Sequence, residues 1–267
     1  MPSAVELISV HVPKTAGSTF GKAILPQIYP PDHILYDYYD LPIDTLIKEG
    51  QLTRETRVIH GHFSAQKYRE YYPNTKIVIW LRNPILLLIS AYYFCITPSY
   101  DNVFFDENHR YVVENQLNLS EFVNQPFTDN MIYNYFAKEL KLTDFYFVGI
   151  QEFFRDDLND LQNSLGWPPL KVLSSNRNSY DNYQDKVMDT LNNQSLIDKI
   201  VSLNSADMEL YKEALSLRYQ RKGLSSSIEM YEQSLKESQS RLRYNSCKEL
   251  QLNKYSGLLS EQGVNPP

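Results

Sequence analysis

The chain has 267 residues and is 42% hydrophobic, which suits one α/β domain with a large buried core and disfavours wholesale disorder. Its formal net charge of −6 gives the surface no broad attraction for DNA, RNA or anionic lipid, so nucleic acid is not an expected partner. Two cysteines, Cys95 and Cys247, are too few and too widely spaced for a disulfide framework or a zinc pattern.

The first strand is expected at residues 5–12, a short β-branched run that ends at Pro13. A helix should follow over residues 18–25, with Ser18 or Thr19 near its N-cap. Between this helix and the next strand, only a short amphipathic piece around "PIDTLIKEG" is expected.

The remaining elements alternate between apolar runs and helical patterns. They are strands at 57–63, 76–82 and 144–150, a helix capped by Asn83 that starts at Pro84, helices at 129–140 and 151–167, one or two helices within 195–220, an irregular stretch at 97–130, and a loop at 168–185.

Strands that alternate with helices predict a parallel sheet with helices on both faces. The expected fold is therefore α/β: a P-loop-like parallel β-sheet flanked by helices, in three layers and a single domain. We expect this domain to span residues 1–223, and residues 224–267 to form a helical or polar tail because the chain becomes rich in Ser, Glu and Gln after Gly223. Ligands of such sheets bind beyond the carboxyl ends of the strands.

Targeting and membrane signals are not evident. The first 14 residues lack the basic segment and apolar core of a signal peptide, and no run reaches the roughly 18–20 apolar residues of a membrane span. The nearest run is interrupted by Arg82 and Pro84. A cytoplasmic protein with no transmembrane segment is therefore expected.

The first strand leads into "HVPKTAGST", which resembles a phosphate-binding turn. Gly17 permits a close backbone approach, the amides of a loop that enters a helix can hold an anion, and Lys14 can add an ammonium. The alternative is an ordinary turn with a solvated lysine. The Gly-Lys-Ser/Thr order of ATP-binding loops occurs nowhere in the chain, which disfavours a Walker-type magnesium-ATP enzyme.

A second anion-binding site is expected at the end of the strand at 76–82, in "WLRNPILLLISAYYF". Arg82 offers a guanidinium suited to phosphate, and Ser90 lies about two helical turns beyond the cap, a rise of roughly 10 Å. Alone, Ser90 would be a serine at the edge of the core. Two separate anion-binding sites suggest that the ligand is a nucleoside with phosphates at both ends.

These two stretches resemble the signatures of sulfotransferases that use 3′-phosphoadenosine 5′-phosphosulfate (PAPS), whose product is 3′-phosphoadenosine 5′-phosphate (PAP). The carbohydrate branch, which includes the heparan sulfate and dermatan/chondroitin enzymes, is the most similar. Its "PKTAGT/S" loop, its "R-D-P" helix with "S-x-Y-Y-F", and segments like "FVGIQEFFRDDLNDL" and "NSADMELYKEA" all have counterparts within residues 7–215.

The resemblance implies which residues bind PAPS. The first loop would hold the 5′-phosphosulfate, Arg82 and Ser90 the 3′-phosphate, and Arg177, in "SSNRNS", would close over the nucleotide unless it is a plain surface arginine. The loop residues are Lys14, Thr15, Ala16, Gly17, Ser18 and Thr19.

In "IHGHF", His60 and His62 should share a face of their strand, because alternate residues point the same way. They could be a structural or surface pair, and a two-histidine metal site would lack an evident third ligand. The 2-O-sulfotransferases resembled here carry His-Gly-His at this place, which implies that His62 is the general base and that His60 supports it. In the in-line transfer expected of such an enzyme, Lys14 would stabilise the charge that develops on the leaving oxygen.

The expected function is transfer of a sulfuryl group from PAPS to a hydroxyl of a carbohydrate or other hydroxylated acceptor, in line and with a histidine base. A kinase-like phosphotransferase and a non-catalytic nucleotide- or glycan-binding protein are the alternatives. Two departures from the family pattern stand out: Asn83 replaces the usual Asp, and "ILLL" follows Pro84 where charges are frequent. That apolar run could be extra core or a contact between subunits of a homo-oligomer.

Overall fold

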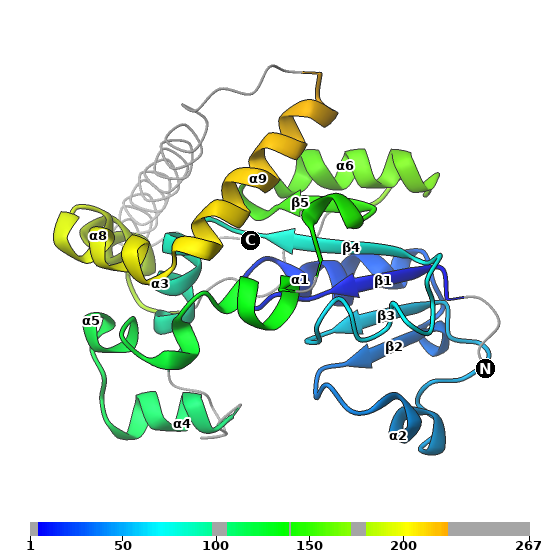
Figure 1. The fold of residues 1–267 in the computed structure, drawn as a ribbon, viewed down its shortest axis with the longest axis horizontal. Helices are drawn as coiled ribbons and strands as arrows, with labels where there is room; N and C mark the ends of the chain where they lie inside the picture. Colours follow the sequence, from blue (N-terminus) through cyan, green and yellow to red (C-terminus); the bar gives the residue numbers. More distant parts are fainter. Residues whose placement is uncertain (1–4, 98–105, 139, 172–179, 224–267) are drawn as a thin grey trace, which may run out of the picture.

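The fold is built on a five-stranded sheet, seen in a computed structural model that describes residues 5–97, 106–138, 140–171 and 180–223 (Figure 1). The strand order is β2-β3-β1-β4-β5, and every neighbouring pair is parallel, which confirms the expected α/β class. The strands are β1 (Leu7–Val10), β2 (Ile34–Asp37), β3 (Val58–Gly61), β4 (Lys76–Leu81) and β5 (Phe147–Ile150).

Helical segments connect and flank the strands. In chain order they are α1 (Gly17–Thr19), the π-helix η1 (Phe20–Ile24), the short η2 (Leu25–Gln27) and η3 (Pro31–His33), α2 (Ile43–Lys48), α3 (Pro84–Cys95), α4 (Glu107–Glu114), α5 (Leu119–Phe122), η4 (Pro126–Thr128), the π-helix η5 (Tyr133–Ala137), η6 (Leu142–Asp144), η7 (Gln151–Phe153), α6 (Phe154–Leu165), α7 (Tyr183–Leu191), α8 (Gln194–Leu203) and α9 (Ser205–Arg221).

Alternation along the strands sends side chains into two separate cores. In β1, Leu7 packs into a core with residues of η1 and α6, whereas Ile8 and Val10 pack into a larger core with residues of α3 and α9. Because each face of the sheet is covered by its own helices, the molecule has the three layers that the sequence predicts.

Helix α3 begins as expected. The side chain of Asn83 accepts hydrogen bonds from the backbone N–H groups of Ile85 and Leu86, and Pro84 occupies the first turn, where it needs no donor. The apolar run after Pro84 is buried within the chain's own core. It therefore serves the interior of this fold, the first of the two roles considered for it.

Several local predictions were wrong. Helix α1 has Ala16 as its N-cap, without a side-chain hydrogen bond, rather than Ser18 or Thr19. The four-residue strand β2 was missed because "ILYD" is too short to show alternation. Helix α7 was also missed, and it begins at Tyr183, inside the loop predicted at 168–185.

The stretch at 97–130 is also more regular than expected. From Asp106 onward it contains α4 and α5, and each begins with a side-chain cap: Asp106 accepts from the N–H of His109, and Asn118 forms a capping box with Glu121. The Asn-x-x-Glu spacing was the overlooked signal for α5.

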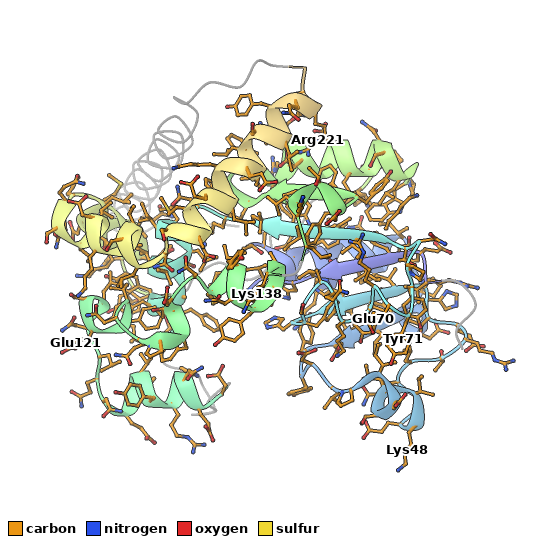
Figure 2. The ribbon with its side chains drawn as sticks, in the orientation of Figure 1. Lys48, Glu70, Tyr71, Glu121, Lys138 and Arg221 are labelled. Atoms are coloured by element: carbon orange, nitrogen blue, oxygen red, sulfur yellow. The ribbon has the colours of Figure 1, made fainter. Side chains whose placement is uncertain are left out.

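Helix α9 is tied to α6 through buried charges. Arg218 Nε donates to Asp157 Oδ1 at 2.7 Å, and Asp157 Oδ2 accepts from the N–H of Ile150 at the end of β5. Arg221 extends these contacts from the last turn of α9 (Figure 2) to Asp160 and to the carbonyl of Val148. The network anchors the helix that covers the β5 edge.

Residues 224–267, expected to form a separate tail, lie outside the described residues. Within the described ranges, no helix is both long enough and apolar enough to cross a membrane.

Candidate functional site

Four neighbouring strands each end directly before a polar or aromatic residue of the candidate site. Tyr38 follows β2, His62 follows β3, His11 follows β1 and Arg82 follows β4. Because the strands are parallel and adjacent in this order, the four residues follow one another along the carboxyl edge of the sheet. This is the edge at which α/β sheets bind ligands.

The loop after β1 has an unusual backbone. Lys14 and Ala16 have positive φ angles of 65° and 67°, which non-glycine residues seldom adopt, and Thr15 Oγ1 bonds back to the carbonyl of Val12 at 2.7 Å. Left-handed residues that alternate with right-handed ones turn successive N–H groups toward one point, as in anion-binding nests. Strain of this kind gathers at ligand-binding loops.

Gly17 and Gly21 bring this loop and its helix down onto the histidines. A Cβ at Gly17 would overlap the ring of His11, and a Cβ at Gly21 would overlap the ring of His60. No larger residue fits at either position, so the close approach of the loop depends on both glycines. Of the other loop residues, Thr19 is buried and Ser18 is half-buried.

The two segments predicted to bind anions contact each other. Arg82 Nη1 donates a hydrogen bond to the backbone carbonyl of Lys14 at 3.0 Å, and Lys14 Nζ lies 3.9 Å from the ring centroid of Phe94 in α3. Burial, together with the neighbouring Arg82 charge, lowers the pKa of Lys14 to about 8. Two cations held side by side favour an anion in their vicinity.

Ser90 lies on the α3 face that Lys14 approaches. It is buried and precedes Phe94 by four residues, so the two side chains are neighbours on one face of the helix. Lys14, Arg82 and this face of α3 are thus brought together. Arg177, the third predicted nucleotide contact, lies outside the described residues.

The guanidinium of Arg82 can donate a further hydrogen bond. Its Nε is buried and has no hydrogen-bond partner among the residues that the structure describes. Nearby, Glu152 Oε1 accepts from the N–H of Asn83, and Glu152 Oε2 accepts from Tyr211 Oη. Burial raises the pKa of Glu152, and the Arg82 charge opposes that rise. The sequence reasoning did not identify Glu152, because nothing in its strand-helix segment marks it.

His60 sits beneath the edge, fully enclosed. It is 1% exposed, and its Nδ1 lies 2.9 Å from Ser9 Oγ on the adjacent strand. Burial, with a smaller contribution from His62, lowers its pKa to about 3, so the ring is neutral. An acceptor in solvent would not reach this imidazole directly.

His62 is half-buried at the edge itself. Its Nε2 lies 3.2 Å from Nδ1 of His11, its ring centroid is 5.2 Å from that of Tyr38, and burial lowers its pKa. Its backbone N–H bonds to the carbonyl of Asp37, whose carboxylate is held by Lys67 and Tyr68. His62 therefore has a fixed backbone and one engaged ring nitrogen.

Sequence reasoning missed His11 and Tyr38. His11 stood within the motif, and only the adjacency of β1 and β3 brings it against His62. Tyr38 follows the strand that was missed. Although three histidines gather here, no group of three or more His, Cys, Asp or Glu side chains in the described ranges is arranged to hold a metal ion.

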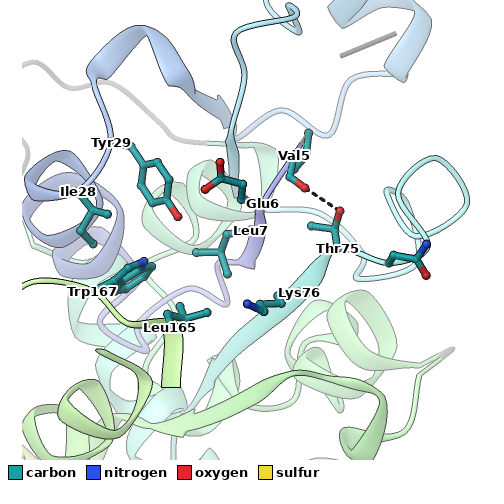
Figure 3. Close-up of a pocket in the computed structure, with 10 residues that line it drawn as sticks. Val5, Glu6, Leu7, Ile28, Tyr29, Thr75, Lys76, Leu165 and Trp167 are labelled. Atoms are coloured by element: carbon teal, nitrogen blue, oxygen red, sulfur yellow. Dashed lines mark hydrogen bonds between the residues drawn. The ribbon is translucent and has the colours of Figure 1, made fainter. Parts of the chain in front are cut away.

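An open cavity of about 550 Å³ lies elsewhere (Figure 3). Leu7 and Lys76, which begin β1 and β4, line it together with Tyr29 and Trp167. It therefore lies at the amino ends of these strands, at the opposite edge of the sheet from His62 and Arg82, and it is not part of the candidate site.

No family model matches the chain, and no curated protein matches its sequence. Among solved structures, it is similar to mouse sulfotransferase SULT7A1 complexed with PAP, with 13% identity and a TM-score of 0.38 over 81% of this chain and 90% of that one. It is also similar to a sulfotransferase from Alicyclobacillus acidocaldarius, with 18% identity and a TM-score of 0.35 over 76% of this chain and 96% of that one.

Proposed function

We propose that the protein is a PAPS-dependent sulfotransferase that transfers a sulfuryl group to a hydroxyl of a carbohydrate or other hydroxylated acceptor. The observation that carries the proposal is the contact between Arg82 and Lys14. It joins the two motifs that resemble the PAPS-binding signatures at one edge of the sheet, beside His62.

In this proposal the loop from Lys14 to Thr19 holds the 5′-phosphosulfate of PAPS. The positive φ angles of Lys14 and Ala16 are typical of loops whose N–H groups bind anions, and Lys14 adds a positive charge that an anion would stabilise. Arg82, with its unpartnered Nε, and Ser90 hold the 3′-phosphate. Arg177, which lies outside the described residues, remains a proposed contact.

The proposed chemistry divides between His62 and Lys14. Bound PAPS would supply a sulfuryl group attached to a phosphate that can leave. His62, whose pKa is lowered by burial, is neutral near pH 7 and accepts the proton of the acceptor hydroxyl. Lys14 and the loop N–H groups stabilise the charge that develops on the leaving oxygen. His60, buried below, supports the His62 strand through its bond to Ser9.

Ligand binding separates this proposal from the alternatives. PAP should raise the melting temperature and bind in calorimetry, whereas ATP with magnesium should do neither. Transfer of labelled sulfate from PAPS to glycans, lipids and small phenols would then identify the acceptor class. Stabilisation by magnesium-ATP without stabilisation by PAP would overturn the proposal in favour of a phosphotransferase. PAP binding without transfer to any acceptor class would favour a non-catalytic protein.

A further inference from the structure

The bond between His11 and His62 gives His11 a place in the site that the motif resemblance does not assign. His62 Nε2 and His11 Nδ1 are 3.2 Å apart, and the two rings meet edge to face with centroids 4.4 Å apart. His11 is only 6% exposed, whereas His62 is half-buried.

The sheet itself holds this pair in register. Strands β1 and β3 are parallel neighbours in which Ser9 pairs with His60 and Val10 with Gly61. The N–H of His11 continues the ladder by donating to the carbonyl of Gly61 at 2.8 Å. The His11–His62 contact is therefore the next side-chain contact on the same face of the sheet, two residues beyond the Ser9–His60 contact, and backbone hydrogen bonds position it.

The ring of His11 is confined on its other sides. The ring of His60 stacks against it with centroids 5.1 Å apart, and the ring of Tyr38 stands edge-on at 5.9 Å. Gly17 lies so close that a Cβ at this position would overlap the ring of His11. A ring so enclosed has little freedom to turn its Nδ1 away from His62.

Both rings of the pair are neutral. Burial, followed by the charges of His60 and His62, lowers the pKa of His11 to about 2, and burial lowers the pKa of His62. The other charged groups that act on His11 are Lys22 and Lys14, and both lower its pKa. A hydrogen bond between two neutral imidazoles needs one protonated and one unprotonated nitrogen.

Two arrangements of that proton are possible. If His11 Nδ1–H donates to His62 Nε2, then Nδ1 of His62 carries its ring proton and His62 has no free basic nitrogen. If His62 Nε2–H donates to His11 Nδ1, then Nδ1 of His62 keeps its lone pair. Only the second arrangement lets His62 accept a proton from a substrate, and it also retains the hydrogen bond once His62 is charged.

We propose that His11 is a positioning residue whose Nδ1 accepts a hydrogen bond from His62 Nε2–H, which holds His62 in the tautomer with Nδ1 free to take the acceptor's proton. The catalytic part of this inference rests on the proposed function, whereas the tautomer assignment does not. In the step, the hydroxyl O–H bond breaks and an N–H bond forms at His62 Nδ1. The acceptor oxygen forms a new bond to sulfur while the bond from sulfur to the phosphate oxygen breaks, and the leaving phosphate keeps that electron pair.

The tautomer is tested directly by long-range ¹H–¹⁵N spectra of the histidine side chains in the full-length protein. We expect His62 to be protonated at Nε2 and unprotonated at Nδ1, with Nδ1 of His11 also unprotonated. His11→Phe should change the ¹⁵N shift of His62 Nε2, because it removes the bond partner. A proton found on Nδ1 of His62 would overturn the assignment whether or not the protein is a sulfotransferase.

The catalytic role is tested with His11→Phe and His11→Asn. Phe keeps the planar ring and removes the acceptor, whereas Asn places an amide oxygen near the position of Nδ1. We expect His11→Phe to lower kcat by about 10- to 100-fold, the range found when the partner that orients a metal-binding histidine is lost. PAP affinity should be kept, and His11→Asn should recover much of the rate.

The matched control is His33→Phe, at the opposite edge of the sheet just before β2, which should leave kcat unchanged. Equal kcat for His11→Phe and the wild type would overturn the positioning role. A variant that lost PAP affinity and melting temperature along with kcat, without rescue by His11→Asn, would show that His11 is structural, which also contradicts the proposal. Failure of the wild type to bind PAP would instead count against the proposed function.

Discussion

Arg82 donates a hydrogen bond of 3.0 Å to the backbone carbonyl of Lys14, so the first residue after β4 directly supports the loop after β1. The two residues are 68 positions apart in sequence, and the contact exists because β1 and β4 are parallel neighbours. This contact joins the two proposed phosphate-binding segments into one cationic unit at the carboxyl edge of the sheet. The predictions below depend on this unit and on the strands that form it.

Arg82→Ala should weaken PAP binding by roughly 10- to 100-fold. A hydrogen bond to a charged group is worth about 1.5–3 kcal/mol, and the variant also removes support from the Lys14 loop. Isothermal titration calorimetry would measure the affinity. Lys76→Ala is the matched control, since it removes a cation from the other end of the same strand and should leave PAP affinity unchanged. If both variants bind PAP like the wild type, Arg82 is not part of the nucleotide site.

PAP affinity should decline as the pH rises above about 8. Lys14 has its pKa lowered to about 8 in the free protein, and a bound phosphate would raise that pKa, so binding at higher pH must take up a proton. Calorimetry between about pH 7 and 9.5 avoids the phosphate ionisation near pH 6. The Lys14→Met variant should bind PAP more weakly and lose this dependence on pH. If PAP affinity declines as steeply with pH in that variant, the pH dependence comes from another group.

The acidic limb of kcat/KM should lie below pH 6.5. Burial lowers the pKa of His62 from 6.5, so the ring stays neutral, and able to accept a proton, at more acidic pH than an exposed histidine. His62→Ala should lower turnover by about 10²- to 10⁴-fold and keep PAP affinity. The measurement is a series of initial rates from about pH 5 to about pH 8. Full turnover by the variant would remove His62 as the base.

Gly149→Ala should destabilise the fold by about 1–3 kcal/mol, the usual cost of overpacking. A Cβ at Gly149 in β5 would overlap the six-membered ring of Trp80 in β4. Trp80→Phe removes the outer atoms of that ring, so Gly149→Ala should cost less in the Trp80→Phe background. Urea unfolding of the four proteins gives this coupling. Equal costs in both backgrounds would show that Trp80 does not limit the space at Gly149.

Much of the fold could be predicted because its signals are local. The apolar run that became β4, the Asn83–Pro84 start of α3 and the alternation of strands with helices all depend on neighbouring residues. The failures had local causes as well. Four residues of β2 are too few for a period-2 pattern, and the left-handed Ala16 begins α1 without the side-chain cap that serine and threonine suggest.

The sequence predicted the site residues at the end of each strand, but not how these strand ends are arranged relative to one another. The sequence indicated that polar residues would stand at strand ends, and it singled out Lys14, His62, Arg82 and Ser90. It carried no information about which strands are neighbours, since parallel strands are joined by long crossovers that permit several orders.

The amino-acid sequence by itself determined the strand-loop-helix units and the chemistry at the end of each. The tertiary structure decided the order β2-β3-β1-β4-β5, and with it the line of Tyr38, His62, His11 and Arg82 along one edge. Hydrophobic periodicity acts within a segment, whereas strand order follows from packing the whole core on both faces of the sheet. For this reason the pairing of His11 with His62 became visible only in the folded chain.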